Sequence, residues 1–109
     1  MSAPTLAKAA PAFAALGDKT RLLIVARLCK DGPLSISRLT DGSKISRQAI
    51  TKHLDALSKS GLIRSELTDR ERIFRLEGKR LTEVCHYLDT VSEQWDKAID
   101  RLRGFVEVD

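Results

Sequence analysis

Several features that other classes of protein require are missing from this sequence. Its 109 residues hold no apolar run close to the ~20 residues that span a membrane. They show no glycine-rich phosphate loop, no paired carboxylates and no nucleophile placed with a base, so we expect neither an enzyme nor a cofactor. Only 5% of the residues are aromatic, which predicts a core of mainly aliphatic side chains.

Histidines are also few, and no targeting segment is evident. With two histidines in the chain, one histidine among scattered carboxylates would make a poor zinc site. Residues 1–15 are rich in Ala and Pro but lack the long Leu/Val-rich core of a secretory signal. We therefore expect no metal and no membrane partner, with a cytoplasmic location as the default.

The residues that are present suffice for one small folded domain, 1–109. The chain is 42% hydrophobic and 31% charged, as globular proteins are. Its net charge of +4 is unevenly distributed, because residues 44–75 hold eight basic and four acidic residues, whereas residues 80–109 hold four basic and seven acidic ones. This asymmetry favours a nucleic-acid surface on the first segment and a protein-contact element on the second.

The most informative stretch is 44–61, which has the pattern of a helix with its own start and stop. Ser46 can cap its N-terminus, and Gly61 fits the position just after its end, where a left-handed backbone is cheapest for glycine. A narrow apolar stripe recurs at helical spacing: Ala49, Ile50, Leu54 and Leu57.

The other face of this helix carries basic and hydrogen-bonding side chains, with no acid before Asp55: Arg47, Gln48, Thr51, Lys52 and, nearer the edge, His53. Arg suits guanine, Gln suits adenine, Thr can touch a thymine methyl and Lys neutralises phosphate. The pattern predicts a DNA-recognition helix, although an ordinary solvated amphipathic helix has the same periodicity. His53 either donates to a phosphate or is satisfied within the protein.

The segments on either side favour the DNA hypothesis. Residues 34–41 fit either a strand or a short helix, and we choose a helix because the following turn, 41–43, then completes a helix-turn-helix. Runs 62–67 and 72–76 predict a β-hairpin with a charged tip. Arg70 and Arg72 at that tip suit a minor groove, unless the tip charges pair with one another. Residues 34–76 would then form the DNA-binding unit.

Two helices are expected before this unit. Pro11 restricts the first to about 12–16, since proline is tolerated only in a first turn. Asp18 can cap the second, which 31–33, Asp-Gly-Pro, should end. We expect the second helix to be largely buried through its apolar residues: Leu22, Leu23, Val25, Ala26, Leu28 and Cys29.

One long helix, about 79–106, should close the chain. Its apolar residues are spaced alternately by three and four, a heptad seam: Leu81, Val84, Leu88, Val91, Trp95, Ala98, Leu102 and Phe105. The roughly 25 residues from Lys79 to Gly104 alone would extend about 37 Å, longer than so small a core can cover. The seam therefore predicts a homodimer that also involves Phe13 and Leu16 of the 12–16 helix. The alternative is that the helix packs only within its own chain.

Three stretches together resemble the ArsR/SmtB-type bacterial repressors: FAALGDKTRLLIVARL (13–28), ISRQAITKHLDALSKSGLI (45–63) and RERIFRL (70–76). The resemblance covers nearly the whole chain. It implies a mainly α fold with a small two-stranded antiparallel β wing, a winged helix-turn-helix of order α-α-α-α-β-β-α. It also implies a homodimeric repressor that binds a pseudo-palindromic operator in double-stranded DNA. The candidate DNA contacts are Ser46, Arg47, Gln48, Thr51, Lys52, His53, Arg70 and Arg72.

The chain departs from the metal-sensing members of that family. Their cysteines would fall within 34–37, which reads Leu-Ser-Ile-Ser and holds no thiol. Zinc-binding members use an Asp/His set on the final helix, where this chain offers His86, Asp89 and Glu93 but no second histidine. The resemblance therefore leaves the effector unknown.

Cys29 and Cys85 leave two interpretations open. Some members sense sulfur species or oxidants through one cysteine on the second helix and one on the last, which is where these two lie. Alternatively, both are small hydrophobes that fill the core. A further alternative function is a dimeric winged-helix module that acts mainly through protein partners docked on its acidic final helix.

Overall fold

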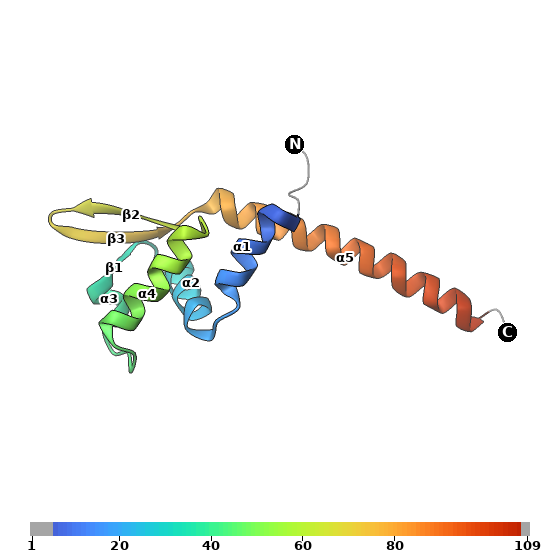
Figure 1. Ribbon diagram of the computed structural model, residues 1–109, viewed down its shortest axis with the longest axis horizontal. Coiled ribbons are helices and arrows are strands. Elements are labelled where there is room, and N and C mark those ends of the chain that lie inside the picture. The colour runs from blue at the N-terminus through green and yellow to red at the C-terminus, as the bar shows by residue number, and fades with distance from the viewer. Residues whose placement is uncertain (1–5, 108–109) are drawn as a thin grey trace.

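The chain forms five helices and a small sheet within residues 6–107, which are the residues that the computed structural model describes (Figure 1). The elements, in order, are α1 (Leu6–Leu16), α2 (Lys19–Asp31), β1 (Leu34–Ser35), α3 (Ile36–Thr40), α4 (Arg47–Lys59), β2 (Ile63–Thr68), β3 (Glu71–Leu76) and α5 (Gly78–Glu107). The expected winged helix-turn-helix is confirmed, with one strand more than the sequence predicted.

Helix α1 begins earlier than the sequence predicted. Proline at position 11 lies in its interior rather than in its first turn, so the expected range 12–16 is too short. Proline removes one backbone N–H and its hydrogen bond. Pro11 is exposed, whereas Ala9, Ala12 and Ala15 are buried against the rest of the chain. Tertiary packing of this alanine face therefore outweighs the local cost.

Helix α2 has the predicted ends but not the predicted burial. The Asp18 carboxylate accepts a hydrogen bond from the Arg21 backbone N–H, and Gly32 ends the helix with φ 79°. Only Ile24 and Leu28 are buried on α2. The expectation of a largely buried helix is wrong, because one face of α2 packs inward and the other lies open, with Leu22 and Leu23 51% and 59% exposed.

Residues 34–41 adopt both of the structures that their sequence allowed. Leu34 and Ser35 form β1, which pairs antiparallel with β3 through Leu34 opposite Phe74. Ser35 then caps α3 by accepting from the Arg38 backbone N–H. The choice of helix is therefore right for residues 36–40 and wrong for the first two, whose strand depends on a partner forty residues away.

The recognition helix α4 ends in a Schellman motif. Ser60 is its C-cap, and Gly61 follows with φ 81°, a conformation that glycine adopts without a Cβ clash. The Gly61 N–H donates to Ser58 and the Leu62 N–H donates to Leu57, the pair of bonds that defines this motif. The glycine stop expected from the sequence is confirmed.

Strands β2 and β3 form the predicted hairpin, called the wing below. They pair from Ile63 opposite Leu76 to Thr68 opposite Glu71, so the turn consists of Asp69 and Arg70 alone. The sheet order is β1-β3-β2. The buried core beneath it is aliphatic apart from Phe74, as the composition predicted.

Helix α5 leaves the globular part of the molecule. Its 30 residues give a length of about 45 Å, within a molecule that measures 68 × 34 × 22 Å. Its first turns pack against α1, and the rest projects into solvent, with no other element of the described chain beside it (Figure 1). None of the helices within residues 6–107 combines the length and the apolarity needed to cross a membrane.

Candidate nucleic-acid interface

The first turns of α4 present a polar surface and hold an apolar one against the core. Ile50, Leu54 and Leu57 are almost completely buried, so the rotation of the helix is fixed. The residues that the sequence assigned to the DNA face are exposed: Ser46, Arg47, Gln48, Thr51 and Lys52. The α4 N-terminus and the wing lie toward the same end of the molecule, opposite the C-terminal end of α5 (Figure 1).

The cations of this face are available to a ligand. Within residues 6–107, the side chains of Arg47, Lys52 and Arg70 make no hydrogen bond or ion pair. By contrast, Arg75 pairs with Glu66, where Nη2 and Oε2 are 3.6 Å apart. An unpaired exposed cation needs no protein contact to be broken before it neutralises a phosphate.

Two side chains of the α4 face already make local hydrogen bonds. The Ser46 hydroxyl accepts from the Ala49 backbone N–H at 3.1 Å, which confirms it as N-cap. The Thr51 hydroxyl donates to the Arg47 carbonyl at 2.8 Å. Because its proton is engaged, Thr51 offers a DNA partner its methyl group and an acceptor oxygen, which suits contact with a thymine methyl.

His53 lies at the edge of this face, against α2. Its Nδ1 is 3.7 Å from Oδ2 of Asp18, and its side chain is only 24% exposed. The backbone N–H of Arg21, ahead of the charges of His53 and Arg21, holds the pKa of Asp18 below its usual value. This geometry favours the interpretation that His53 is satisfied within the protein. A phosphate contact by His53 stays a prediction.

The turn of the wing places a strained arginine at its tip. Asp69 and Arg70 have φ of 49° and 68°, the left-handed pair that a two-residue hairpin turn requires and that glycine or asparagine normally supplies. The Arg72 Nη1 donates to the Ser65 hydroxyl at 2.9 Å, which directs that side chain along β2.

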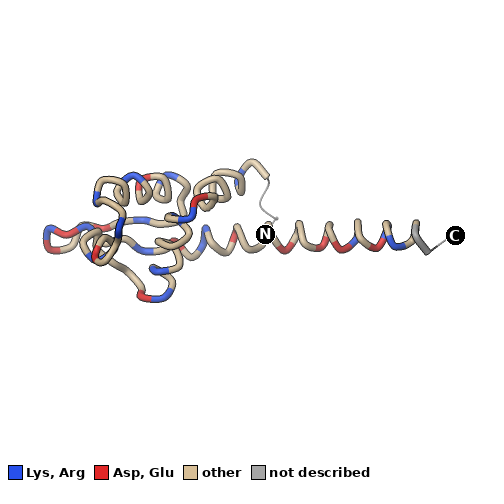
Figure 2. Tube along the Cα trace, turned by 90° about the horizontal axis from the view of Figure 1, so that it is seen from below, with Lys and Arg blue, Asp and Glu red and all other residues tan. Residues whose placement is uncertain are grey.

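The charges of the tip do not neutralise one another. Among the residues that the structure describes, no ion pair joins any of Asp69, Arg70, Glu71 and Arg72. The alternative of a self-paired tip is therefore not supported. Figure 2 shows both signs of charge at the wing tip, while acidic residues recur along the projecting part of α5.

Lys44 was missing from the sequence-based candidates. It lies two residues before the Ser46 cap, and it is exposed. Its side chain makes no hydrogen bond or ion pair with any residue from 6 to 107. Its position beside a capping serine was a usable signal, since backbone N–H groups at a helix N-terminus and a nearby cation both suit phosphate.

The apolar seam of α5 changes character along the helix. Val84 is 5% exposed and completes the core of its own chain, with half-buried Leu81 beside it, so it offers little surface to a partner. Beyond this point, Leu88, Trp95 and Leu102 are 49%, 66% and 64% exposed. Val91 and Ala98, also in the seam, are half-buried.

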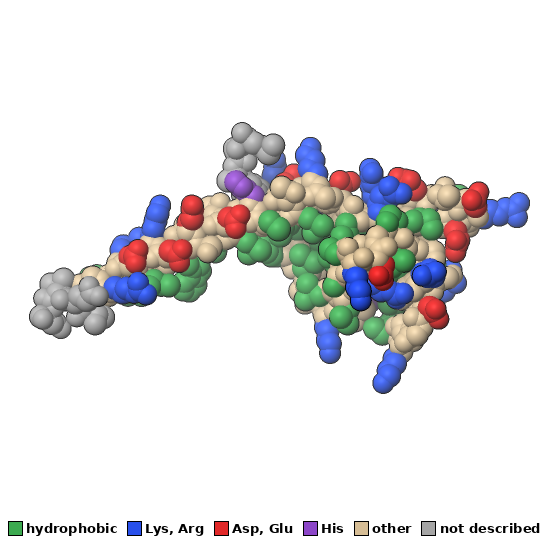
Figure 3. Space-filling view, turned by 180° about the vertical axis from the view of Figure 1, so that it is seen from behind, with side chains coloured by type: hydrophobic (Ala, Val, Ile, Leu, Met, Phe, Trp, Pro, Cys, Tyr) green, Lys and Arg blue, Asp and Glu red, His purple; other side chains and the backbone are tan. Residues whose placement is uncertain are grey.

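Helix α1 meets α5 where the exposed seam begins. Phe13 packs against Tyr87 with ring centroids 5.7 Å apart and planes at 58°. Phe13 and Leu16 are half-buried within the chain. Hydrophobic side chains gather on one side of α5 and continue onto the globular part (Figure 3). The apolar surface is therefore continuous between the two elements that the sequence assigned to a dimer interface.

Neither cysteine fills the core. Cys29 and Cys85 are both exposed, free thiols, so the interpretation of them as buried hydrophobes is wrong. Within residues 6–107, no group of three His, Cys, Asp or Glu side chains could hold a metal ion.

Comparisons with known proteins agree with this fold. A family model described as a helix-turn-helix domain matches residues 16–66. The HTH-type transcriptional regulator Rv2034 of Mycobacterium tuberculosis is 32% identical over 88 residues, which cover 81% of this chain and 78% of that protein.

Two solved structures extend the similarity. An ArsR-like transcriptional regulator from Rhodococcus sp. RHA1 has a TM-score of 0.79 and 35% identity, covering 94% of this chain and 96% of that one. The transcriptional repressor BigR from Xylella fastidiosa has a TM-score of 0.58 and 25% identity, covering 75% of this chain and 83% of that one.

Proposed function

The chain belongs to the ArsR-type winged helix-turn-helix transcriptional regulators, and from this premise we propose that it is a homodimeric repressor of a pseudo-palindromic operator. As a member of this family it is a DNA-binding regulator of transcription and not an enzyme. In the proposed complex, α4 of each protomer enters a major groove, and the two half-sites lie about one helical turn apart.

One observation carries this proposal: the exposed face of α4 bears Arg47, Gln48, Thr51 and Lys52, and its two cations are unpaired within the described chain. Arg47 and Gln48 lie in the first turn, the part of a recognition helix that reaches base edges in such complexes. Lys52 neutralises phosphate at the groove rim, and Arg70 and Arg72 bring the wing to the backbone or the minor groove.

The homodimer is supported by the uncovered seam of α5. Trp95, Leu102 and Phe105 are between 64% and 83% exposed, on a projecting helix. Large apolar side chains repeated at heptad spacing are stabilised when a second helix removes them from water. A second copy of the chain offers the same seam, so a symmetric pair of α5 helices would cover both seams at once. This seam favours self-association over the alternative of an acidic docking surface for other proteins.

Repression would follow if the bound dimer blocks transcription at the operator, and the similar protein BigR of Xylella fastidiosa is a transcriptional repressor. A thiol switch is a second candidate property, because Cys29 and Cys85 are both exposed and so reachable by an oxidant or a polysulfide. Its test compares DNA binding by wild type and by a Cys29→Ser, Cys85→Ser double variant after such treatment. If DNA binding by the two proteins changes equally, or in neither, the thiol switch is excluded.

The experiment for DNA binding begins with a duplex selected from a random-sequence library by the purified chain. Arg47→Ala or Gln48→Ala should weaken binding to it by roughly 1–3 kcal/mol and relax base preference at one position. Affinity for random duplex should fall steeply with salt, as counterion release requires.

The matched control is Lys97→Ala, which removes an exposed cation from α5, far from the proposed DNA-binding face of α4 and the wing. It should leave both base preference and the salt dependence unchanged. If Arg47→Ala, Gln48→Ala and Thr51→Ala all bind as the wild type does, the assignment of this face is wrong. If no DNA binds even at low salt, a module acting through protein partners becomes the better explanation.

A further inference from the structure

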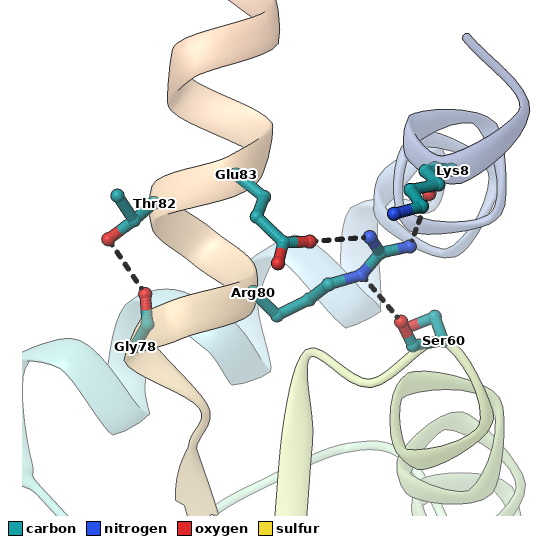
Figure 4. A network of polar contacts seen from close by, with 6 residues as sticks. All are labelled: Lys8, Ser60, Gly78, Arg80, Thr82 and Glu83. Atoms are coloured by element: carbon teal, nitrogen blue, oxygen red, sulfur yellow. Dashed lines mark hydrogen bonds and ion pairs between the residues drawn. The ribbon is translucent and has the colours of Figure 1, made fainter. Parts of the chain in front are cut away.

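One side chain, Arg80, contacts the end of α4 and α1 at the same time. It lies in the first turn of α5 and is 17% exposed. Its Nε donates to the Ser60 carbonyl at 3.0 Å, and its Nη2 donates to the Lys8 carbonyl at 2.6 Å. Figure 4 shows the guanidinium between these two residues, one at the end of α4 and the other on α1. A single planar group thus joins three helices.

Glu83 holds the guanidinium in this orientation. Arg80 Nη1 donates to Glu83 Oε2 at 3.1 Å, one turn further along α5. Because the guanidinium is a rigid fork, fixing one nitrogen on its own helix sets the direction of the other two. Glu83 is itself only 36% exposed, so the pair is partly shielded from water.

The Ser60 carbonyl, which accepts from Arg80, lies at the C-terminus of α4, where a positive charge stabilises a helix. Ser60 is the C-cap, and carbonyls in the last turn of a helix lack partners within it, while the helix dipole favours positive charge there. The aliphatic stem of Arg80 also covers Gly61, since a Cβ added there would lie 3.7 Å from Arg80 Cγ. A backbone bond from Glu77 N to the Leu62 carbonyl, 2.8 Å long, ties the same junction to the start of α5.

We propose that Arg80 is a positioning residue that sets the angle of α4 relative to α1 and α5. The inference rests on the proposed function, in which α1 and α5 form the dimer and α4 enters DNA. The two-fold axis of that dimer passes between the α5 helices. The angle of α4 against α5 therefore fixes the separation of the two recognition helices, and with it the half-site spacing that the dimer accepts.

The first test measures that separation without DNA. Ser58, exposed in the last turn of α4, is changed by Ser58→Cys in a Cys29→Ser, Cys85→Ser background and carries a spin label. We expect one narrow distance between the two labels of a dimer. Adding Arg80→Met should broaden or shift the distribution. An unchanged distribution in a folded, dimeric Arg80→Met chain would overturn the proposal.

The second test measures spacing preference on DNA. The probes are the library-selected duplex and derivatives with one base pair added or removed at its centre. Arg80→Met should bind the selected duplex about 2- to 30-fold more weakly, and its discrimination against the altered spacings should shrink. A residue needed only for stability would lower binding to all three probes equally. Retained discrimination therefore contradicts a positioning role.

Two further variants keep the outcome decisive. Arg103→Met makes the same change on the same helix, where the side chain is 70% exposed and pairs with Asp100 one turn earlier, and it should behave as the wild type. Arg80→Lys keeps the charge but replaces the fork by a point charge, so it should fold and still broaden the label distance. A monomeric parent chain would refute the proposed dimer and this inference together. If the parent is dimeric but the Arg80 variants match it in label distance and in spacing discrimination, only the inference is refuted.

Discussion

His53 of the recognition helix lies 3.7 Å from Asp18, the residue that caps α2. The carboxylate of Asp18 also accepts the backbone N–H of Arg21 at 3.1 Å. One acidic side chain thus begins α2 and faces the middle of α4. This relationship explains why a histidine in the midst of an exposed polar stretch is half-buried, and it makes the α2–α4 contact sensitive to acid.

Acid should weaken the fold partly through Asp18. Its pKa is below the usual 3.8, first because of the hydrogen bond from Arg21, so its contribution is complete above the unfolded pKa and is lost as pH falls through the folded one. We expect the free energy of unfolding to fall more steeply below about pH 5 in wild type than in Asp18→Asn, which keeps a capping oxygen without the charge. Urea unfolding at stepped pH measures this. Asp41→Asn, at an exposed carboxyl, should keep the wild-type slope.

His53 should matter for packing more than for phosphate. His53→Ala is expected to lower the free energy of unfolding while leaving the slope of log affinity against log salt unchanged. Lys52→Ala, one residue earlier and fully on the exposed face, should reduce that slope by about 1. Salt titrations of random-duplex binding compare the two. A smaller slope for His53→Ala would assign His53 to a phosphate instead.

Ser46 should stabilise α4 whether or not it touches DNA. Ser46→Ala removes the oxygen that accepts from the Ala49 N–H and should cost about 1 kcal/mol of unfolding free energy. Ser46→Asn and Ser46→Asp both keep a cap, but only the second adds a negative charge facing DNA. Chemical denaturation should rank both above Ser46→Ala, while DNA affinity should drop most for Ser46→Asp. If Ser46→Asn and Ser46→Asp lose as much unfolding free energy as Ser46→Ala, the capping hydrogen bond is not the source of the stability.

Arg70 should lower the stability of the fold while it increases the affinity for DNA. Its φ of 68° is a conformation that costs an arginine about 1–2 kcal/mol and a glycine almost nothing. Arg70→Gly should therefore raise the unfolding midpoint yet weaken DNA binding and reduce its salt slope by about 1. Asp69→Gly relieves the other left-handed residue without removing a cation, so it should stabilise the fold and keep the affinity. Weaker folding of Arg70→Gly would show that the turn is not strained.

Trp95 should report the dimer directly, because it is the only tryptophan and is 66% exposed in the single chain. Its fluorescence should shift to the red on dilution as the dimer dissociates. Trp95→Glu should weaken dimerisation about 30-fold or more without unfolding the chain, as light scattering and circular dichroism can show. Glu93→Ala, at an exposed position outside the seam, should stay dimeric. A dimer that survives Trp95→Glu would place the interface elsewhere.

Local signals in the sequence predicted the start of α2 and both ends of α4. Ser46 and Asp18 cap the helices for which they were chosen, and Gly61 ends α4 with the expected left-handed backbone. The errors occur where a distant partner decides. Pro11 is accepted inside α1 because an alanine face packs inward, and Leu34 is a strand residue because β3 lies beside it.

The sequence by itself determined α2, α4, the wing hairpin, the polar face of α4 and the heptad seam, because caps, turns and periodicity act over a few residues. Tertiary structure decided how those patterns divide between core and surface. It buried Val84 within the chain and left Leu88 and Trp95 open, exposed both cysteines, and brought Arg80 to carbonyls 20 and 72 residues away. Burial and hydrogen bonding over such separations depend on how the helices pack, and no local pattern encodes that.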